Sequence, residues 1–236
     1  MPQTKVTIGY GTLFEMADPA TPTAWTYIPE VFDVKPPAVN VAQSDATSNQ
    51  SPNRSREFIP GLIDQQEMSF AMNYIPGSNA DIAILQSVGR KRNCRLTYPN
   101  GVSALFVGSL STYEPDSPTE ERQTASVSLT LSGGFVLTPA AAPRFVVNPV
   151  ISGVAVVGSI LQLDAGVIGG AISSEVQWQR STDGGVGAAW ADIPDAVALA
   201  YVPTSADVGE RIRAVVTAMN EAFSTDQASV MTAVVA

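Results

Sequence analysis

A change in sequence character near residue 140 constrains the fold more than any other feature. Residues 138–143 form a hinge-like run of proline and alanine, TPAAAP, with strand-rich sequence on both sides. Domain boundaries commonly fall in such segments, and 236 residues suffice for two ordinary domains. We therefore predict a first domain over residues 1–138, a linker over 139–144 and a second domain over 145–236.

The composition removes most routes to catalysis. The chain has no histidine and one cysteine, Cys94, so a Ser-His-Asp triad, a histidine-ligated metal and a thiolate zinc site are excluded. No glycine-rich phosphate loop is present. The nearest carboxylate pairs, Glu120 with Glu121 and Asp192 with Asp195, are typical of exposed loop charges. We predict that the protein is not an enzyme and needs no cofactor or metal.

The charge is mildly acidic along the whole chain. The formal net charge is −9, and neither half has the basic excess of a protein that grips nucleic acid. One cysteine forms no intramolecular disulfide, which fits folding in a reducing cytoplasm. We find no signal-like apolar run at the start and no stretch near the roughly 20 apolar residues that span a membrane. We expect synthesis in the cytoplasm and no membrane partner.

Two segments of the first domain, residues 65–74 and 123–132, alternate between apolar and polar residues. The main apolar positions are Met68, Phe70, Met72, Val127 and Leu129. A period of two indicates strands with one buried face and one wet face. The wet side of the second strand carries small hydroxyls and almost no positive charge. Two interpretations remain open here, a solvated sheet surface and the lining of a pore.

One short helix is predicted between these strands. Ser78 can cap its first turn, and Asp81 can reach back to complete a capping box. Gly89 ends the helix. An apolar stripe along it consists of Ile82, Leu85 and Val88.

A basic cluster follows this helix. It consists of Arg90, Lys91, Arg92 and Arg95. Three interpretations are open: a contact with nucleic acid, a solvated helix end, or an interface that pairs with acids.

Residues 42–60 differ from the rest of the first domain because they are mostly polar and follow neither the strand nor the helix period. Unstructured loops of this length are uncommon in compact domains unless they are functional or disordered. The segment is either a floppy surface loop or an arm that orders on a partner through hydrogen bonds. The candidate contact residues are Gln43, Ser44, Asp45, Asn49, Asn53, Arg54 and Arg56.

The second domain has the short alternating strands and glycine turns of a β-sandwich. Trp178 lies at the middle of one predicted strand, and Ile212 and Val216 lie on the inward row of another. We predict that these three side chains form the core.

Residues 145–236 resemble bacterial and phage Ig-like domains. The resemblance depends on short runs such as Ile151-Ser152-Gly153, Trp178-Gln179-Arg180, Tyr201-Val202-Pro203-Thr204 and Asp207-Val208-Gly209. Both disulfide cysteines of antibody domains are missing, and Arg211 stands where a corner tyrosine is common. An Ig-like fold does not by itself specify a function.

The first domain resembles the tail-tube proteins of long-tailed phages, most closely the non-contractile lambda-like kind. The order of elements supports this: two early strands, a long polar loop, the strand EMSF at residues 67–70, IPG at 75–77 with a short helix, RLTYPNG at 95–101, and a closing Ser/Thr-alternating strand. Some members of this family carry an Ig-like domain after the tube domain. The fold class expected is mainly β, an antiparallel sandwich or barrel with one short helix, followed by an Ig-like β-sandwich.

The resemblance implies a structural virion protein of the phage tail. Hexameric rings would stack into a tube, the long loop would bridge successive rings, and DNA would pass through the lumen without specific binding. Other tail proteins, such as a tape measure and a tail terminator, are implied partners. The residues expected to line the lumen are Glu67, Ser69, Thr124, Ser126, Ser128 and Thr130.

Two alternatives to this function remain open. The chain could be the tube subunit of a contractile tail or injection device, or a cell-surface adhesin whose working part is the Ig-like module. The missing signal sequence argues against the adhesin.

Overall fold

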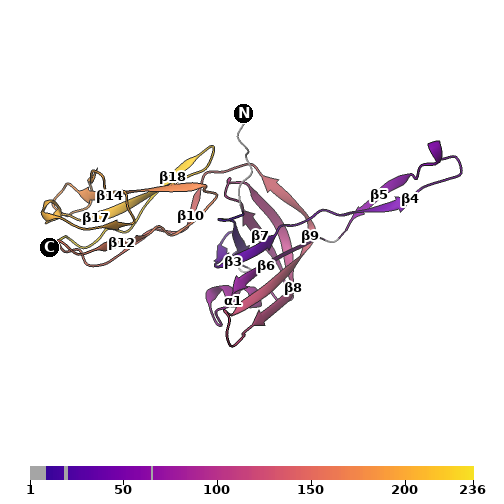
Figure 1. The fold of residues 1–236 in the computed structure, drawn as a ribbon, viewed down its shortest axis with the longest axis horizontal. Coiled ribbons are helices and arrows are strands. Elements are labelled where there is room, and N and C mark those ends of the chain that lie inside the picture. Colours follow the sequence, from indigo (N-terminus) through magenta and orange to yellow (C-terminus); the bar gives the residue numbers. More distant parts are fainter. Residues whose placement is uncertain (1–8, 19–20, 65) are drawn as a thin grey trace. The chain divides into compact units, whose positions relative to one another are not determined.

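The computed structural model describes residues 9–18, 21–64 and 66–236 (Figure 1). The chain divides into two compact units. One contains Leu13–Leu96 and Ala104–Thr138, and the other contains Thr97–Ser103 and Pro139–Ala236. The fold is mainly β, as predicted. The predicted domain bounds remain a prediction.

The first unit is built on a seven-stranded sheet whose resolved pairings are antiparallel. In spatial order its strands are β2 (Trp25–Ile28), β1 (Leu13–Ala17), β7 (Lys91–Thr97), β8 (Ser103–Asp116), β9 (Thr124–Thr138), β6 (Glu67–Asn73) and β3 (Val31–Lys35).

The edge strands of this sheet, β2 and β3, follow one another in the chain with only Pro29 and Glu30 between them. In a flat sheet, seven strands would hold the two edges about 29 Å apart. The connection from Ile28 to Val31 spans at most about 11 Å. The sheet therefore curls until its edges approach each other, which gives it an inner and an outer face (Figure 1).

The inner face forms the core of this unit, and β1, β6, β7, β8 and β9 all contribute to it. Phe14 and Phe70 meet there with ring centroids 4.8 Å apart. The other large side chains of the inner face include Met16, Met68, Met72, Leu96, Phe106, Val127 and Leu129. The alternation predicted for residues 65–74 and 123–132 is confirmed, because the apolar members of both strands are buried.

Helix α1 (Asn79–Leu85) is the α-helix of the described residues. Ser78 caps it, since its Oγ accepts from the backbone N–H of Asp81 at 3.2 Å. Asp81 accepts from the backbone N–H of Gly77 at 2.8 Å and from the hydroxyl of Tyr113 at 2.6 Å. Ile84 is fully buried. The stripe of Ile82, Leu85 and Val88, by contrast, faces solvent.

Residues 42–60 are not an irregular loop. They lie in a separate two-stranded antiparallel hairpin formed by β4 (Val41–Asp45) and β5 (Phe58–Ile63), with a single 3-10 turn, η1 (Pro52–Arg54), between the strands (Figure 1). The expectation of a segment without strand pattern was wrong. The sequence signal was weak because the register shifts between Val41 and Gln43, where β5 has one residue more than β4 and its alternation is interrupted.

The second unit contains two small sheets around one core. One sheet has the order β15 (Trp190–Asp192), β14 (Ser173–Ser181), β17 (Ile212–Met219), β18 (Ser224–Ala228), and the other has the order β11 (Val150–Ser152), β12 (Leu161–Asp164), β16 (Ala200–Tyr201). A further pair is formed by β10 (Arg144–Val147) and β13 (Val167–Gly169). Trp178, Ile212 and Val216 have no exposed surface and lie in the common core.

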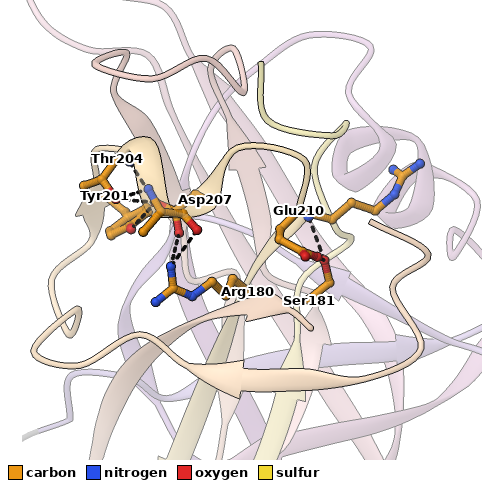
Figure 2. Close-up of polar contacts among 8 residues, drawn as sticks. Arg180, Ser181, Tyr201, Thr204, Asp207 and Glu210 are labelled. Atoms are coloured by element: carbon orange, nitrogen blue, oxygen red, sulfur yellow. Dashed lines mark hydrogen bonds and ion pairs between the residues drawn. The ribbon is translucent and has the colours of Figure 1, made fainter. Parts of the chain in front are cut away.

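A buried polar network fixes one end of this sandwich (Figure 2). Asp207, in the 3-10 turn η2 (Ser205–Asp207), is fully buried. It accepts from the Tyr201 hydroxyl at 2.7 Å and the Thr204 backbone N–H at 2.7 Å, and it pairs with Arg180 at 3.2 Å. The Tyr201 ring stacks on Trp178 with centroids 5.5 Å apart. The network therefore links β14, β16 and η2 across the core.

Replacing Tyr201 by phenylalanine should change how stability depends on alkaline pH. Burial, followed by the hydrogen bond to Asp207, raises the pKa of Tyr201 from 10.0 to about 12. The stabilisation from this shift is complete below pH 10 and is lost as the pH rises from 10 to 12, because the unfolded chain ionises first. In urea unfolding followed by tryptophan fluorescence, Tyr201→Phe should be less stable at pH 7 and should lose less stability than the wild type between pH 10 and 12. Equal losses would contradict the role given to Tyr201.

Candidate functional site

A mostly polar surface covers the outer face of the sheet along β6 and β9. The antiparallel register pairs Glu67 with Thr130 and Ser69 with Ser128, and the next two pairs are Ala71 with Ser126 and Asn73 with Thr124. Directly opposed residues of an antiparallel pair share a face. The structure therefore brings all six predicted lining residues together on one surface, which we call the polar face: Glu67, Ser69, Thr124, Ser126, Ser128 and Thr130.

Every member of the polar face is exposed or half-buried, while the residues between them on both strands are mostly buried. The pleat sends successive side chains to opposite sides, so the face stays wet because its neighbours fill the core. The surface continues onto β8, where the Ser109 hydroxyl donates to the backbone oxygen of Thr130 at 3.4 Å. Nothing in this arrangement of hydroxyls and one carboxylate resembles a catalytic group.

The polar face has two lysines at its borders. Lys35 of β3 lies directly opposite Ser69, after a register shift at Asp33, and its side chain is exposed. Lys91 of β7 donates from Nζ to the hydroxyl of Ser132 at 2.8 Å. The expectation of almost no positive charge thus holds for residues 123–132 but not for the neighbouring strands. Sequence alternation within one strand carries no information about the strand beside it.

A buried ion pair lies on the same outer face, further along the sheet. Arg95 of β7 donates from Nε and Nη2 to the carboxylate of Glu15 on β1, at 2.9 and 3.1 Å, and its guanidinium lies 4.4 Å from the centroid of the Trp25 ring. Glu15 is 1% exposed. Tyr27 of β2 is the register partner of Glu15. Its pKa is raised, first by burial and then by the negative charges of Glu30 and Glu15. Because the pair is bidentate and mostly buried, it fixes β1 against β7.

Glu15→Gln should destabilise the sheet unit by about 3 kcal/mol, because the glutamine leaves the Arg95 charge without its counter-ion in a mostly buried site. The measurement is the free energy of unfolding from denaturant titration. Glu120→Gln is the matched control, since Glu120 is exposed on the β8–β9 connection and should change stability by less than about 0.5 kcal/mol. An equal effect of both substitutions would contradict the structural role of the pair.

The basic cluster after α1 is not one patch. Successive residues of β7 point to opposite faces, so Lys91 and Arg95 lie on the outer face while Arg92 is buried and donates from Nη1 to the backbone oxygen of Ala17 at 3.0 Å. Burial lowers the pKa of Arg92. Of the three interpretations, pairing with an acid applies to Arg95, whose partner is Glu15.

The β4–β5 hairpin is exposed along both strands. Its tip is organised by local hydrogen bonds: Ser51 donates to the Glu57 carboxylate at 2.7 Å, and Asp45 accepts from the Thr47 backbone N–H at 2.8 Å. These bonds from Thr47 lower the pKa of Asp45. Arg56 lies 3.8 Å from Asp45. The predicted contact residues are all on this exposed hairpin: Gln43, Ser44, Asp45, Asn49, Asn53, Arg54 and Arg56.

The hairpin also carries large apolar side chains that sequence reasoning missed. The exposed members are Val41 at 39%, Phe58 at 51%, Ile59 at 60%, Leu62 at 87% and Ile63 at 60%. The run FIPGLI at residues 58–63 was the available signal, but its proline and glycine obscured the strand. A two-stranded hairpin is only marginally stable in water by itself. The hairpin therefore presents exposed apolar side chains as well as its polar residues.

Conventional reactive groups are missing from the described part of the chain. No cluster of three or more His, Cys, Asp or Glu side chains there has metal-binding geometry. Burial raises the pKa of the Cys94 thiol to about 12, so it is inert at neutral pH. Within the same residues, no helix is both long and apolar enough to cross a membrane.

Residues 8–138 match the family model described as lambda phage tail tube protein. No curated protein matches the chain. Among solved structures, the tail of an empty gene transfer agent particle is similar at 14% identity and a TM-score of 0.49, covering 56% of this chain and 99% of that one. A sheath–tube complex of an extracellular contractile injection system has 9% identity, a TM-score of 0.45 and coverages of 57% and 92%. The SPP1 tail tube has 13% identity, a TM-score of 0.44 and coverages of 55% and 77%.

Proposed function

Since the chain belongs to the lambda phage tail tube protein family, we propose that it assembles with copies of itself into hexameric rings that stack into a DNA-conducting tube. It is a structural protein of the virion tail. The family match over residues 8–138 carries this proposal. Six subunits per ring is the number that the family resemblance implies. A tape measure and a tail terminator are proposed partners.

We propose that the polar face lines the lumen. In a ring of curled sheets, part of each outer face must turn toward the central channel. Hydroxyls offer weak, neutral contacts to phosphate, so they let DNA move, whereas unpaired cations would hold it. Lys35 is an exposed cation at the border of this face. Glu67 is its diagonal neighbour across the strand pair, about 7–8 Å away, so the carboxylate partly offsets that charge.

We propose that the β4–β5 hairpin reaches the next ring. Both of its strands are exposed, so it adds nothing to the core of its own subunit. A tube made of identical rings needs one contact that joins subunits along the axis, and this contact is heterologous because the two ends of a ring differ. A projecting element with unpartnered apolar side chains suits that contact.

The C-terminal sandwich is proposed to be an Ig-like domain displayed outside the tube. Its support is the separate core around Trp178 and the two-sheet arrangement. We expect a chain ending at Ala142 to form tubes of the same lumen and smaller outer diameter, because the two units have separate cores. Electron microscopy of that variant is the measurement. A folded, soluble fragment that fails to polymerise would mean that the sandwich takes part in assembly.

The direct test of the proposed function is electron microscopy of the purified full chain. Hollow tubes with a regular axial repeat and six subunits per ring are the expected result. Monodisperse monomers under all conditions of concentration and salt would overturn the proposal and favour the adhesin.

A further inference from the structure

We propose that Asn220 is a clasp that holds the β7–β8 turn and the linker on the C-terminal sandwich, so that these segments move as one body. The turn, residues 98–102, belongs to the same compact unit as the sandwich. Four segments meet at the clasp: this turn, the linker at Ala141, the turn after β13 at Gly170, and the β17–β18 turn at Asn220 itself. The clasp goes beyond the proposed tube function and does not depend on it.

The side-chain amide of Asn220 uses all of its hydrogen-bonding capacity. Its Nδ2 donates to the backbone oxygens of Ala141 at 2.8 Å and Gly170 at 2.9 Å. Its Oδ1 accepts from the backbone N–H groups of Ala222 at 3.0 Å and Phe223 at 2.9 Å. An amide has two donor hydrogens and two acceptor lone pairs, so every site is filled. The oxygen side is local and shapes the β17–β18 turn, whereas the nitrogen side joins segments that lie 79 and 50 residues away in the chain.

The β7–β8 turn reaches the clasp through glycine. The Ala141 N–H donates to the backbone oxygen of Gly101 at 3.1 Å, so Ala141 is bonded through both of its backbone groups. Gly101 is buried and has a φ of +84°. A Cβ at this position would lie 2.5 Å from the Ala141 oxygen and 2.8 Å from Asn220 Nδ2, and a Cβ at Gly170 would lie 3.0 Å from the Gly101 Cα. The backbones therefore pack directly on one another, which only glycine permits at such distances.

The linker depends on these backbone contacts for its order. Ala140, Ala141 and Ala142 are exposed, so none of the three side chains anchors the linker in a core. The bonds of Ala141 hold its middle instead, one to Asn220 and one to Gly101. We therefore expect the linker and the turn to loosen together when the donor side of Asn220 is lost.

The first test is Asn220→Asp, which separates the two sides of the amide. The carboxylate still accepts from Ala222 and Phe223, but it replaces the donor by an oxygen that faces two carbonyl oxygens. In hydrogen exchange of the full chain, read residue by residue by mass spectrometry, the Ala141 amide should exchange about tenfold faster or more, because its hydrogen-bonded neighbourhood opens. The amides of Ala222 and Phe223 should keep their protection. Asn148→Asp adds the same charge at an exposed asparagine of the sandwich and should change none of the three.

The second test compares Gly101→Ala with Gly158→Ala. The two glycines have almost the same φ, +84° and +83°, so the backbone strain of the substitution is matched. Nothing lies within 4 Å of a Cβ at Gly158, whereas a Cβ at Gly101 meets the clasp. Elastase cleaves after small residues, and its rate follows the population of opened linker when opening is fast. Gly101→Ala should be cut after Ala140, Ala141 or Ala142 about tenfold faster than Gly158→Ala, with the site identified from fragment masses.

Each outcome decides for or against the clasp. A fully protected Ala141 amide in Asn220→Asp, or equal linker cleavage of the two glycine variants, would overturn it. Equal loss of protection at Ala141, Ala222 and Phe223 would assign Asn220 to its own turn and would also overturn it. Neither readout requires tubes, so a chain that never polymerises would end the tube proposal and leave the clasp standing.

Discussion

Replacing the β4–β5 hairpin by a two-residue turn should abolish tube formation and leave the subunit folded. Residues 42–62 would be replaced by Asn-Gly, which closes the gap between Val41 and Ile63 because these two are register partners. All residues of both strands are exposed, so their removal takes no side chain from the core. The melting temperature should change by less than about 3 °C, while electron microscopy should show rings or monomers only.

A shorter deletion tells apart the two parts of the hairpin. Joining Ala46 to Glu57 through a tight turn uses an existing contact, since the Ala46 N–H donates to the Glu57 oxygen at 2.9 Å. This variant loses Asn49, Asn53, Arg54 and Arg56 but keeps the apolar strands. We expect it still to form tubes. Loss of tubes in this variant would restore the polar tip residues as the main contact, and long tubes in the full replacement would show that the hairpin does not join the rings.

Introducing lysines on the polar face should slow DNA release more than replacing one of its polar side chains by an apolar one. Ser128→Lys with Thr130→Lys adds two positive charges per subunit, and about a dozen per ring if six subunits surround the lumen. The subunit should still fold, because both positions are on the wet side of β9 and their buried neighbours are unchanged. Tails carrying the double variant should assemble with normal length.

Salt dependence separates electrostatic retention from a simple narrowing of the channel. Contacts between lysine and phosphate release counter-ions, so DNA ejection should be slowest at low salt and should recover toward the wild-type rate as salt rises. Ser205→Lys with Ser224→Lys adds the same charge at exposed positions of the sandwich and should leave ejection unchanged. Normal ejection by the lumen variant at every salt concentration would mean that the polar face does not line the path.

The sequence by itself determined the local patterns. Alternation at a period of two predicted which side chains of β6 and β9 are buried, because the pleat allows no other arrangement when one face meets a core. The absence of histidine excluded whole classes of chemistry. Trp178 was predicted at the centre of the second core because a large apolar residue at mid-strand has few other places to go. The order of these elements was sufficient to identify the family resemblance that the family match then confirmed.

Only the tertiary structure decided which of these segments become neighbours and which of their faces are covered. Lys35 lies beside Ser69 because two strands far apart in sequence are neighbours in the sheet. Arg92 is buried while Lys91 and Arg95 are on the outer face, since the pairing of β7 fixes the side to which each residue of a basic run points. The stripe of Ile82, Leu85 and Val88 looks like a core-facing pattern in the sequence, yet it faces water because Ala80 and Ile84 already fill the contact with the sheet unit. Periodicity defines a face, but long-range packing selects whether that face is covered by the chain itself or left for another molecule.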